Sequence, residues 1–216
     1  MRIAPADSNK TDTAQRILAV AERLFGERGF NGVSTRDIAM AAGVSKANVF
    51  HHYSSKLVLY EAVLRSGSAR FNALLLRLAD DSGELPELLD DFSQQHLQSM
   101  LEHQNAAALF VRHLLDVGGS AEHVMAENIV EQSHDLLMAA FAALQREGKL
   151  AAQVDTRVLA LTLIGGHLSF FLLRNVLVRA GQPVPDAGAF SRTMVRQLID
   201  GIARSPSSSD QKKLDQ

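Results

Sequence analysis

Hydrophobic positions recur at helical spacing along most of this chain, and no segment shows the alternation typical of a half-buried strand. The first stripe runs from Ile17 to Phe25 and stops at Gly29, where a helix can end in a left-handed turn. Asp12 precedes this stripe and suits an N-cap. The pattern therefore predicts an amphipathic helix that begins near residue 12.

Two short helices joined by a glycine turn are predicted next, in the segment STRDIAMAAGVSKANVFHHYSSK from Ser34 to Lys56. The first has apolar positions at i, i+1 and i+4, and Ser34 is its N-cap with an acidic partner three residues on. Gly43 takes the turn, because a residue without Cβ adopts left-handed backbone at least cost. Ser45 caps the second helix, whose buried face begins at Val49. This order predicts a helix-turn-helix.

The spacing of small and apolar residues in this segment suits two crossing helices. Counted from Thr35, the fifth residue is Ala39, the ninth is Gly43 and the fifteenth is Val49. The fifth must be small at the crossing, the ninth must tolerate the turn, and the fifteenth must fill the angle between the helices. A helical hairpin in a protein core is the structural alternative. It does not explain the row of outward polar and small residues on the second helix.

That outward row suits the DNA major groove, in which the second helix of such a motif lies with its N-terminal residues nearest the bases. Asn48 can pair with adenine, Lys46 can reach guanine or a phosphate, and Ala47 can approach a thymine methyl group. Thr35 and Lys56 suit phosphate contacts, which position a protein without reading sequence. The predicted DNA-contacting residues are Thr35, Arg36, Ser45, Lys46, Ala47, Asn48, His51, His52 and Lys56.

The pattern AERLFGERGFNGVSTRDIAMAAGVSKANVFHHYSSKLVLYEAV resembles the N-terminal domain of the tetracycline-repressor (TetR/AcrR) family of bacterial regulators. The resemblance covers the N-terminal part of the chain without a gap. It implies that the nine residues above, with Phe50, lie at or near DNA. Phe50 stands where the family usually has Tyr, whose hydroxyl can reach a phosphate. Phe50 cannot make that bond and is expected to pack instead.

Helical periodicity continues through the rest of the chain. Helices are expected over about residues 55–79, 85–103, 106–117, 121–147, 155–180 and 186–204, with Gly, Pro or Asp in the breaks. The expected fold is all-α, with a three-helix head joined by a connecting helix to a C-terminal helical domain. The expected parts are a disordered arm (1–11), a helix-turn-helix DNA-binding domain (12–55), a ligand-binding and dimerisation domain (56–204) and a disordered tail (205–216).

Charge is unevenly distributed along the 216 residues. The net charge is −2, but residues 1–65 carry +3 and residues 66–216 carry −5. The positive charge lies where phosphate neutralisation needs it, although such a head is only mildly basic. Affinity would therefore come from two linked heads acting together. Cysteine is absent, which excludes disulfides and zinc–thiolate sites, and residues 1–16 show no secretory signal, so a cytoplasmic protein is expected.

The resemblance also implies a homodimer and a small-molecule effector. In that family the last two helices pack against the same two helices of the second subunit. They correspond to about 155–180 and 186–204 in this chain. The stretch 158–173 has no formal charge, but it is shorter than the roughly 20 apolar residues of a membrane span, so burial by other helices is expected. Effector binding in the family shifts the connecting helix and releases DNA from a palindromic operator.

Aromatic, Met and His side chains at helical spacing are the candidates for lining an effector cavity. They are Phe71, Phe92, His96, Met100, His103, Phe110, His113, Leu114, Met138, Phe141, His167, Phe170 and Phe171. Their apolar character favours a hydrophobic or amphipathic small molecule whose identity the sequence does not give. The same pattern is typical of an ordinary core. A regulator controlled by a protein partner, or an activator without small-molecule sensing, is the open alternative.

Other functions have less support. The chain has no G-x-S-x-G, no glycine-rich phosphate loop and no H-E-x-x-H, so no enzyme activity and no cofactor are expected. Six His lie outside the head, and none has a partner at i+3 or i+4 on the same helix. A metal site assembled from different helices is left open, and no metal is expected.

Overall fold

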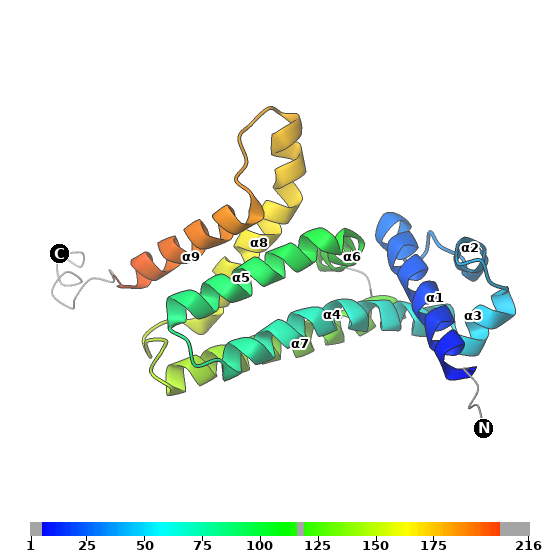
Figure 1. Cartoon of the computed structure of the whole chain (residues 1–216), viewed down its shortest axis with the longest axis horizontal. Helices are drawn as coiled ribbons and strands as arrows, with labels where there is room; N and C mark the ends of the chain where they lie inside the picture. The colour runs from blue at the N-terminus through cyan, green and yellow to red at the C-terminus, as the bar shows by residue number, and fades with distance from the viewer. Residues whose placement is uncertain (1–5, 116–118, 204–216) are drawn as a thin grey trace, which may run out of the picture. The chain divides into compact units, whose positions relative to one another are not determined.

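The computed structural model describes residues 6–115 and 119–203, and in these ranges all regular secondary structure is α-helical. The all-α prediction is confirmed for this part of the chain. The helices are α1 (Ala6–Arg28), α2 (Thr35–Ala41), α3 (Lys46–His52), α4 (Lys56–Asp80), α5 (Leu85–Glu102), α6 (Gln104–Leu115), α7 (Ala121–Arg146), α8 (Thr156–Arg179) and α9 (Ala187–Ala203) (Figure 1). From α2 onwards, their bounds lie within about two residues of those expected. The expected tail, 205–216, lies outside the described residues.

The first helix begins earlier than its apolar stripe suggested. α1 starts at Ala6, six residues before Asp12. The predicted disordered arm over residues 1–11 is therefore wrong for residues 6–11, and residues 1–5 lie outside the described ranges. Extending a helix that is already nucleated costs little per residue, so a polar segment can stay helical without a buried face of its own.

The caps of α2 and α3 formed as predicted. The Ser34 hydroxyl accepts from the Asp37 amide at 3.1 Å, and the Ser34 amide donates to the Asp37 carboxylate at 2.9 Å. The Ser34 hydroxyl also donates to the Asp37 carboxylate at 2.6 Å, and this hydrogen bond, with that of the Ser34 amide, lowers the pKa of Asp37. The Ser45 hydroxyl accepts from the Asn48 amide at 3.1 Å, and Gly43 has a φ of +64° at the turn between the helices.

The chain forms two compact units by the distribution of its contacts. Unit 1 comprises Met1–Asn72 with Met100–His134, and unit 2 comprises Ala73–Ser99 with Asp135–Gln216. The expected domain boundary after residue 55 is therefore displaced. The physical reason is that three short helices bury too little apolar surface by themselves. The head completes its core with the first turns of α4 and with parts of α6 and α7.

The core of unit 1 is built around three aromatic rings. The Tyr60 ring centroid lies 4.9 Å from those of Phe25 and Phe30, both in edge-on contacts. α1 approaches α6 closely because Gly26 has no side chain at their contact. A Cβ at Gly26 would lie 2.7 Å from the backbone oxygen of Asn105. These contacts fix the DNA-binding head on a support that sequence periodicity alone did not assign to it.

Unit 2 contains α8 and α9 packed at close range. Asp155 caps α8 by accepting from the amides of Arg157 and Val158. The rings of Phe170 and Phe190 lie 4.6 Å apart. A Cβ at Gly166 would overlap the sulfur of Met194 on α9, so this glycine is required for the helices to approach.

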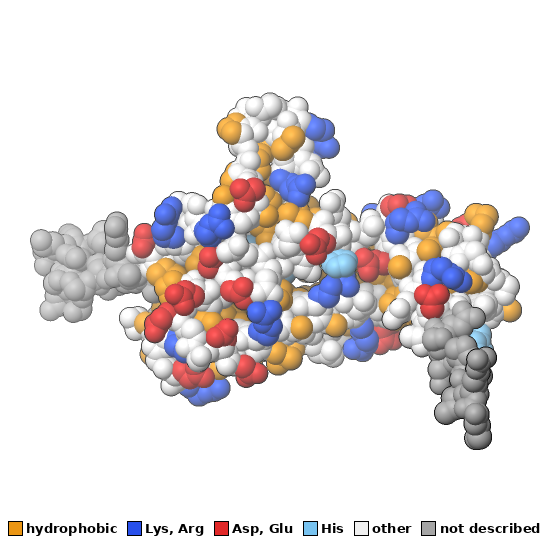
Figure 2. Space-filling model, in the orientation of Figure 1, with side chains coloured by type: hydrophobic (Ala, Val, Ile, Leu, Met, Phe, Trp, Pro, Cys, Tyr) orange, Lys and Arg blue, Asp and Glu red, His pale blue; other side chains and the backbone are white. Residues whose placement is uncertain are grey.

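The opposite face of α8 is apolar and exposed. The exposed large side chains on this face are Val158, Leu161, Leu172 and Val176. The last turns of the helix also expose Leu173, Leu177 and Val178 on its other sides. Figure 2 shows hydrophobic side chains at the base of the projecting end of this helix. By length and composition α8 could also cross a membrane, as core helices of soluble proteins could. An exposed apolar face of this extent is typical of a surface that another molecule covers.

Candidate functional site

The second helix of the helix-turn-helix presents the predicted residues outward. Lys46, Ala47 and His51 of α3 are exposed, and Asn48 and His52 are partly buried. Arg36 on α2 is exposed beside the partly buried Thr35. The structure thus brings the nine predicted residues onto α2, α3 with its N-cap Ser45, and the start of α4, with basic side chains visible around α2 in Figure 2.

An open hollow lies where α2 begins. Its volume is about 500 Å³, and its lining includes Thr35, Arg36, Lys46 and Lys56 from the predicted set. The loop Asn31–Ser34 and Asp37 complete the wall. The cationic side chains of Arg36 and Lys46 suit a phosphate group, and the Asp37 carboxylate is engaged by the Ser34 amide. The hollow is therefore the best candidate for a backbone-positioning contact with DNA.

Lys56 is held inside the head rather than projecting from it. Its ammonium group donates to the carbonyl oxygens of Phe30 and Val33, each at 3.0 Å. It also lies 3.9 Å from the centroid of the Phe30 ring, a cation–π contact. An ammonium group has three donors, so only one N–H remains for a phosphate. The structure shows Lys56 holding the loop before α2, and its phosphate contact stays a prediction that is limited to the remaining N–H.

Phe50 departs from its expected role. Its side chain is 41% exposed, and the Lys46 ammonium lies 5.6 Å from its ring centroid. Phe50 was expected to pack in the interior, but it lies one helical turn after Lys46 on the same exposed face. It is therefore available for apolar contact with a sugar or a thymine methyl group. The i, i+4 spacing from Lys46 was the sequence signal for this.

Two contacts that sequence reasoning did not find hold the helix-turn-helix on α1. The Tyr53 hydroxyl donates to the Ala14 carbonyl at 3.2 Å, and Arg16 Nε donates to the Ala42 carbonyl at 3.1 Å. Both hydrogen bonds join residues more than 20 positions apart, so no local sequence pattern predicts them. Together they orient α3 against α1.

The thirteen effector-cavity candidates are divided between the two units. Unit 1 holds Phe71, Met100, His103, Phe110, His113 and Leu114, and unit 2 holds Phe92, His96, Met138, Phe141, His167, Phe170 and Phe171. Leu114 is 60% exposed, so its assignment to an enclosed cavity is wrong. It is on the outer face of α6, opposite the buried Leu109 and His113. A single cavity lined by all thirteen residues is not what the structure shows.

In unit 1, His113 forms a polar contact in the core. The hydroxyl of the buried Tyr60 hydrogen-bonds Nε2 of His113, and the ring centroid of His123 lies 6.0 Å from that of His113. His123 in turn approaches the Glu127 carboxylate at 3.2 Å. Among the described residues no group of three or more His, Cys, Asp or Glu is placed to hold a metal. His113 is thus a structural partner of Tyr60.

In unit 2, two histidines far apart in sequence meet. Nδ1 of His96 on α5 lies 3.0 Å from Nδ1 of His167 on α8. The Phe92 ring is 5.8 Å from the His96 ring and 6.4 Å from the His167 ring, between centroids. His167 is fully buried. Three candidates, Phe92, His96 and His167, are therefore brought together.

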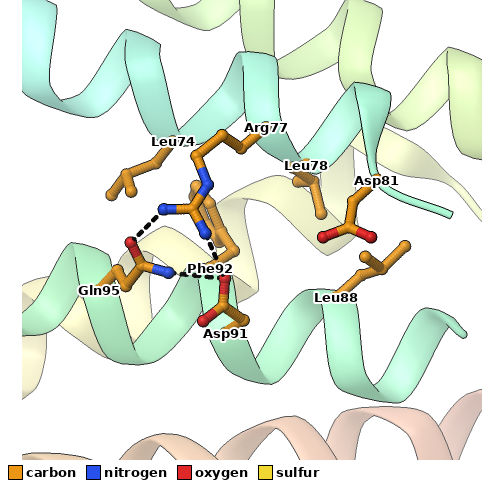
Figure 3. Close-up of a pocket in the computed structure, with 8 residues that line it drawn as sticks. All are labelled: Leu74, Arg77, Leu78, Asp81, Leu88, Asp91, Phe92 and Gln95. Atoms are coloured by element: carbon orange, nitrogen blue, oxygen red, sulfur yellow. Dashed lines mark hydrogen bonds and ion pairs between the residues drawn. The ribbon is translucent and has the colours of Figure 1, made fainter. Parts of the chain in front are cut away.

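A small hollow adjoins this cluster through Phe92. It has room for about one water molecule, ≈10 Å³, and is lined by Phe92, Leu74, Leu78 and Leu88, with polar residues at its edge (Figure 3). Arg77 donates to Gln95 at 2.8 Å and to Asp91 at 3.3 Å, and Gln95 donates to Asp91 at 2.6 Å. These three side chains connect the end of α4 to α5.

Comparison with known sequences agrees with the geometry of the head. A family model described as bacterial regulatory proteins, tetR family, matches residues 17–63. The transcriptional repressor KstR2 of Rhodococcus jostii is 40% identical over 63 residues, which are 28% of this chain and 31% of KstR2. The repressor BepR of Brucella suis is 26% identical over 172 residues, which are 74% of this chain and 81% of BepR. The chain thus matches about a third of KstR2 and most of BepR.

Solved structures share the whole fold at low identity. The fatty acid degradation regulator FadR from Bacillus halodurans has a TM-score of 0.69 at 17% identity, over 87% of this chain and 98% of that one. FadR from Bacillus subtilis, in complex with stearoyl-CoA, has a TM-score of 0.67 at 16% identity, and the match covers 87% of this chain and 98% of that one. AibR, in complex with isovaleryl coenzyme A and operator DNA, has a TM-score of 0.61 at 22% identity, and the match covers 85% of this chain and 96% of that one.

The buried imidazoles of unit 2 predict an acid-sensitive stability. Burial lowers the pKa of His96 to about 4, and burial with the charge of His96 lowers the pKa of His167 to about 3. In the unfolded chain these imidazoles bind protons near pH 6.5, whereas in the folded chain they stay neutral to lower pH. The stability that depends on the neutral imidazoles is therefore fully present above about pH 6.5. It decreases as the pH falls from about 6.5 towards about 4, by up to ~1.4 kcal/mol per pH unit for each imidazole.

Urea unfolding followed by circular dichroism, at about pH 7.5, 6 and 5, checks this. The double variant His96→Gln with His167→Gln should lose less stability over this interval than the wild type. His51→Gln, at an exposed histidine, should follow the wild type. Identical pH profiles for the wild type and the double variant would show that these imidazoles do not govern the acid response.

Proposed function

Because the chain belongs to the TetR/AcrR family of bacterial regulators, we propose that it is a dimeric, sequence-specific repressor released from a palindromic operator by a hydrophobic or amphipathic ligand. The observation that carries the DNA-binding part is the exposed α3 face beside the hollow at the start of α2. In this arrangement α3 enters the major groove. The hollow receives the adjacent phosphate, which fixes the register of α3 on the bases.

Base reading is assigned to Lys46, Ala47 and Asn48 in the first turn of α3. Asn48 presents an amide that matches adenine, and Lys46 can donate to guanine. Phe50 lies one turn after Lys46 and adds apolar contact on the same face. Lys56 holds the loop before α2 and acts as a positioning residue for this surface.

Dimerisation is assigned to the exposed apolar face of α8. Val158, Leu161, Gly165, Leu172 and Val176 follow one another at helical spacing along this face. A Cβ at Gly165 would meet no atom within 4 Å, so the helix backbone is open to close approach there. A two-fold contact through this stripe would place two heads on the two halves of a palindrome.

Effector control is supported by the apolar core of unit 2 and by the acyl-CoA complexes of two proteins with the same fold. A ligand that binds the DNA-free form better than the DNA-bound form shifts the population away from DNA. Control by a protein partner is the second candidate, since the hollow beside Phe92 has room for only about one water molecule and must widen to admit a ligand. The absence of enzyme activity and the cytoplasmic location stay predictions.

Selection of bound sequences from random DNA tests the proposed function. The wild type should enrich a palindrome whose half-sites lie about one helical turn, ~34–36 Å, or a multiple apart. Asn48→Ala should lower affinity for that palindrome about 5- to 150-fold, because a good base contact is worth roughly 1–3 kcal/mol. The same variant should bind random DNA like the wild type. Arg65→Ala, outside the predicted surface, is the control and should keep the wild-type preference.

Enrichment of no sequence by the wild type would refute DNA-sequence recognition. Enrichment of the same palindrome by Asn48→Ala with undiminished affinity would refute the assignment of α3 to the groove.

Substitution of Gly165 tests the dimer. Gly165→Leu places a bulky side chain at the centre of the stripe and should raise the dimer dissociation constant at least tenfold, measured by analytical ultracentrifugation. Gly119→Leu is the matched control, since a Cβ there also meets no atom within 4 Å, and it should remain dimeric. A monomeric wild type would refute the dimer. A Gly165→Leu variant that sediments like the Gly119→Leu variant would show that the dimer contact lies elsewhere.

A further inference from the structure

The core of unit 2 contains polar atoms that its own chain does not satisfy. Nε2 of His167 is fully buried and has no hydrogen-bond partner, and the same is true of the Ser93 and Ser191 hydroxyl oxygens. Buried polar groups in proteins are almost always paired, so each exception requires an explanation. Here three of them come from three helices, α5, α8 and α9, of one unit.

Contacts between α5, α8 and α9 connect the segments that carry these three atoms. Ser93 lies one turn before His96, whose Nδ1 is 3.0 Å from Nδ1 of His167. Ser191 follows Phe190, whose ring contacts Phe170, one turn after His167. α9 also approaches α5 directly, because a Cβ at Gly188 would lie 3.6 Å from the side-chain oxygen of Gln94, the neighbour of Ser93. These contacts each lie within one helical turn of Ser93, His167 or Ser191, and they connect the three helices that carry the unsatisfied atoms.

The hydrogen bond between the imidazoles makes His167 Nε2 adaptable. If His167 donates from Nδ1, its Nε2 is an acceptor, and if His96 donates instead, His167 Nε2 carries a proton and is a donor. The pair can thus meet either a hydroxyl or a carbonyl group without acquiring a charge. The low pKa values of both histidines, caused by burial, agree with a neutral pair at physiological pH.

Charge in this region opposes an anion. Asp90 lies one turn before Ser93, and one of its carboxylate oxygens is buried without a partner. A carboxylate ligand would meet a negative side chain and no cationic partner within the pair. An uncharged polar group attached to an apolar body avoids both costs.

We propose that His167 Nε2, with Ser93 and Ser191, forms the polar anchor of the effector site, and that it takes the carbonyl of an uncharged acyl ester or thioester. This inference rests on the proposed ligand-responsive function and specifies its ligand class. Phe92 is the side chain that must move, because it lines the small hollow and contacts both imidazoles. Its rotation would join the hollow to the anchor, and Phe170 and Phe190 would face the acyl chain.

The test uses the full chain and saturated acyl groups from butyryl to stearoyl, each as a methyl ester, an N-acetylcysteamine thioester and a free carboxylate. Isothermal titration calorimetry at neutral pH measures the dissociation constants. For the best chain length, the ester and thioester should bind the wild type at least ~10-fold tighter than the carboxylate. His167→Phe keeps a ring of similar size but removes Nε2, and it should weaken ester binding ~10-fold or more.

Two controls separate the hydrogen bond from packing. His167→Gln keeps a donor and an acceptor and should retain more ester affinity than His167→Phe. Phe170→Leu removes apolar contact only and should weaken ester and carboxylate binding by the same factor. If His167→Phe does not fold, the imidazole ¹⁵N resonance of His167 Nε2 in the wild type gives the answer, and it should shift when the ester saturates the protein.

Three results would overturn the inference: no probe binds the wild type, the carboxylate binds as tightly as the ester, or the Nε2 resonance is unchanged at saturation. An unchanged resonance would mean that a buried water alone satisfies this atom. Operator selection reports separately on the proposed function. Specific DNA binding with any of these three results would refute only the ligand class, whereas ester binding without specific DNA binding would refute only the regulator.

Discussion

The contact of the Lys56 ammonium with the loop before α2 is the constraint on which the DNA-binding surface depends. The ammonium group holds the carbonyls of Phe30 and Val33 and lies against the Phe30 ring. That ring packs on Tyr60, one turn into α4. The start of α4 is therefore part of the head, and the wall of the hollow near α2 keeps its shape only while α4 stays in place.

This constraint connects DNA recognition to the remainder of the chain. α4 is one continuous helix from Lys56 to Asp80, and its residues belong to unit 1 up to Asn72 and to unit 2 from Ala73. A change in how unit 2 holds the last turns of α4 would therefore act on a helix whose first residue shapes the DNA surface. The Arg77–Asp91–Gln95 contacts hold those last turns on α5. A ligand that rearranges α5 could bias α4 through this connection.

Local rules determined the parts of the structure that the sequence predicted well. The serine caps of α2 and α3 and the turn at Gly43 depend on neighbours within a few residues, and each formed as expected. The bounds of the long helices also followed from periodicity and from Gly or Pro breaks. The start of α1 was wrong because a polar extension of a nucleated helix leaves no apolar signal.

Contacts between distant segments account for what the sequence could not predict. The pairing of His96 with His167 spans 71 positions, and the Lys56 contacts span 26 and 23. A lysine at this place looks like a phosphate ligand until the position of the loop carbonyls is known. The division of the thirteen cavity candidates between two units likewise depends on tertiary packing, which helical spacing does not contain.

The salt dependence of operator binding by Lys56→Met tests this account most directly. Each phosphate contact contributes about 0.9 to the slope of log affinity against log salt concentration. If Lys56 holds the loop internally, the variant binds more weakly at every salt concentration, because the surface is less well positioned, but its slope equals that of the wild type. A slope lower by about 0.9 would mean that Lys56 contacts a phosphate, and it would contradict the internal role.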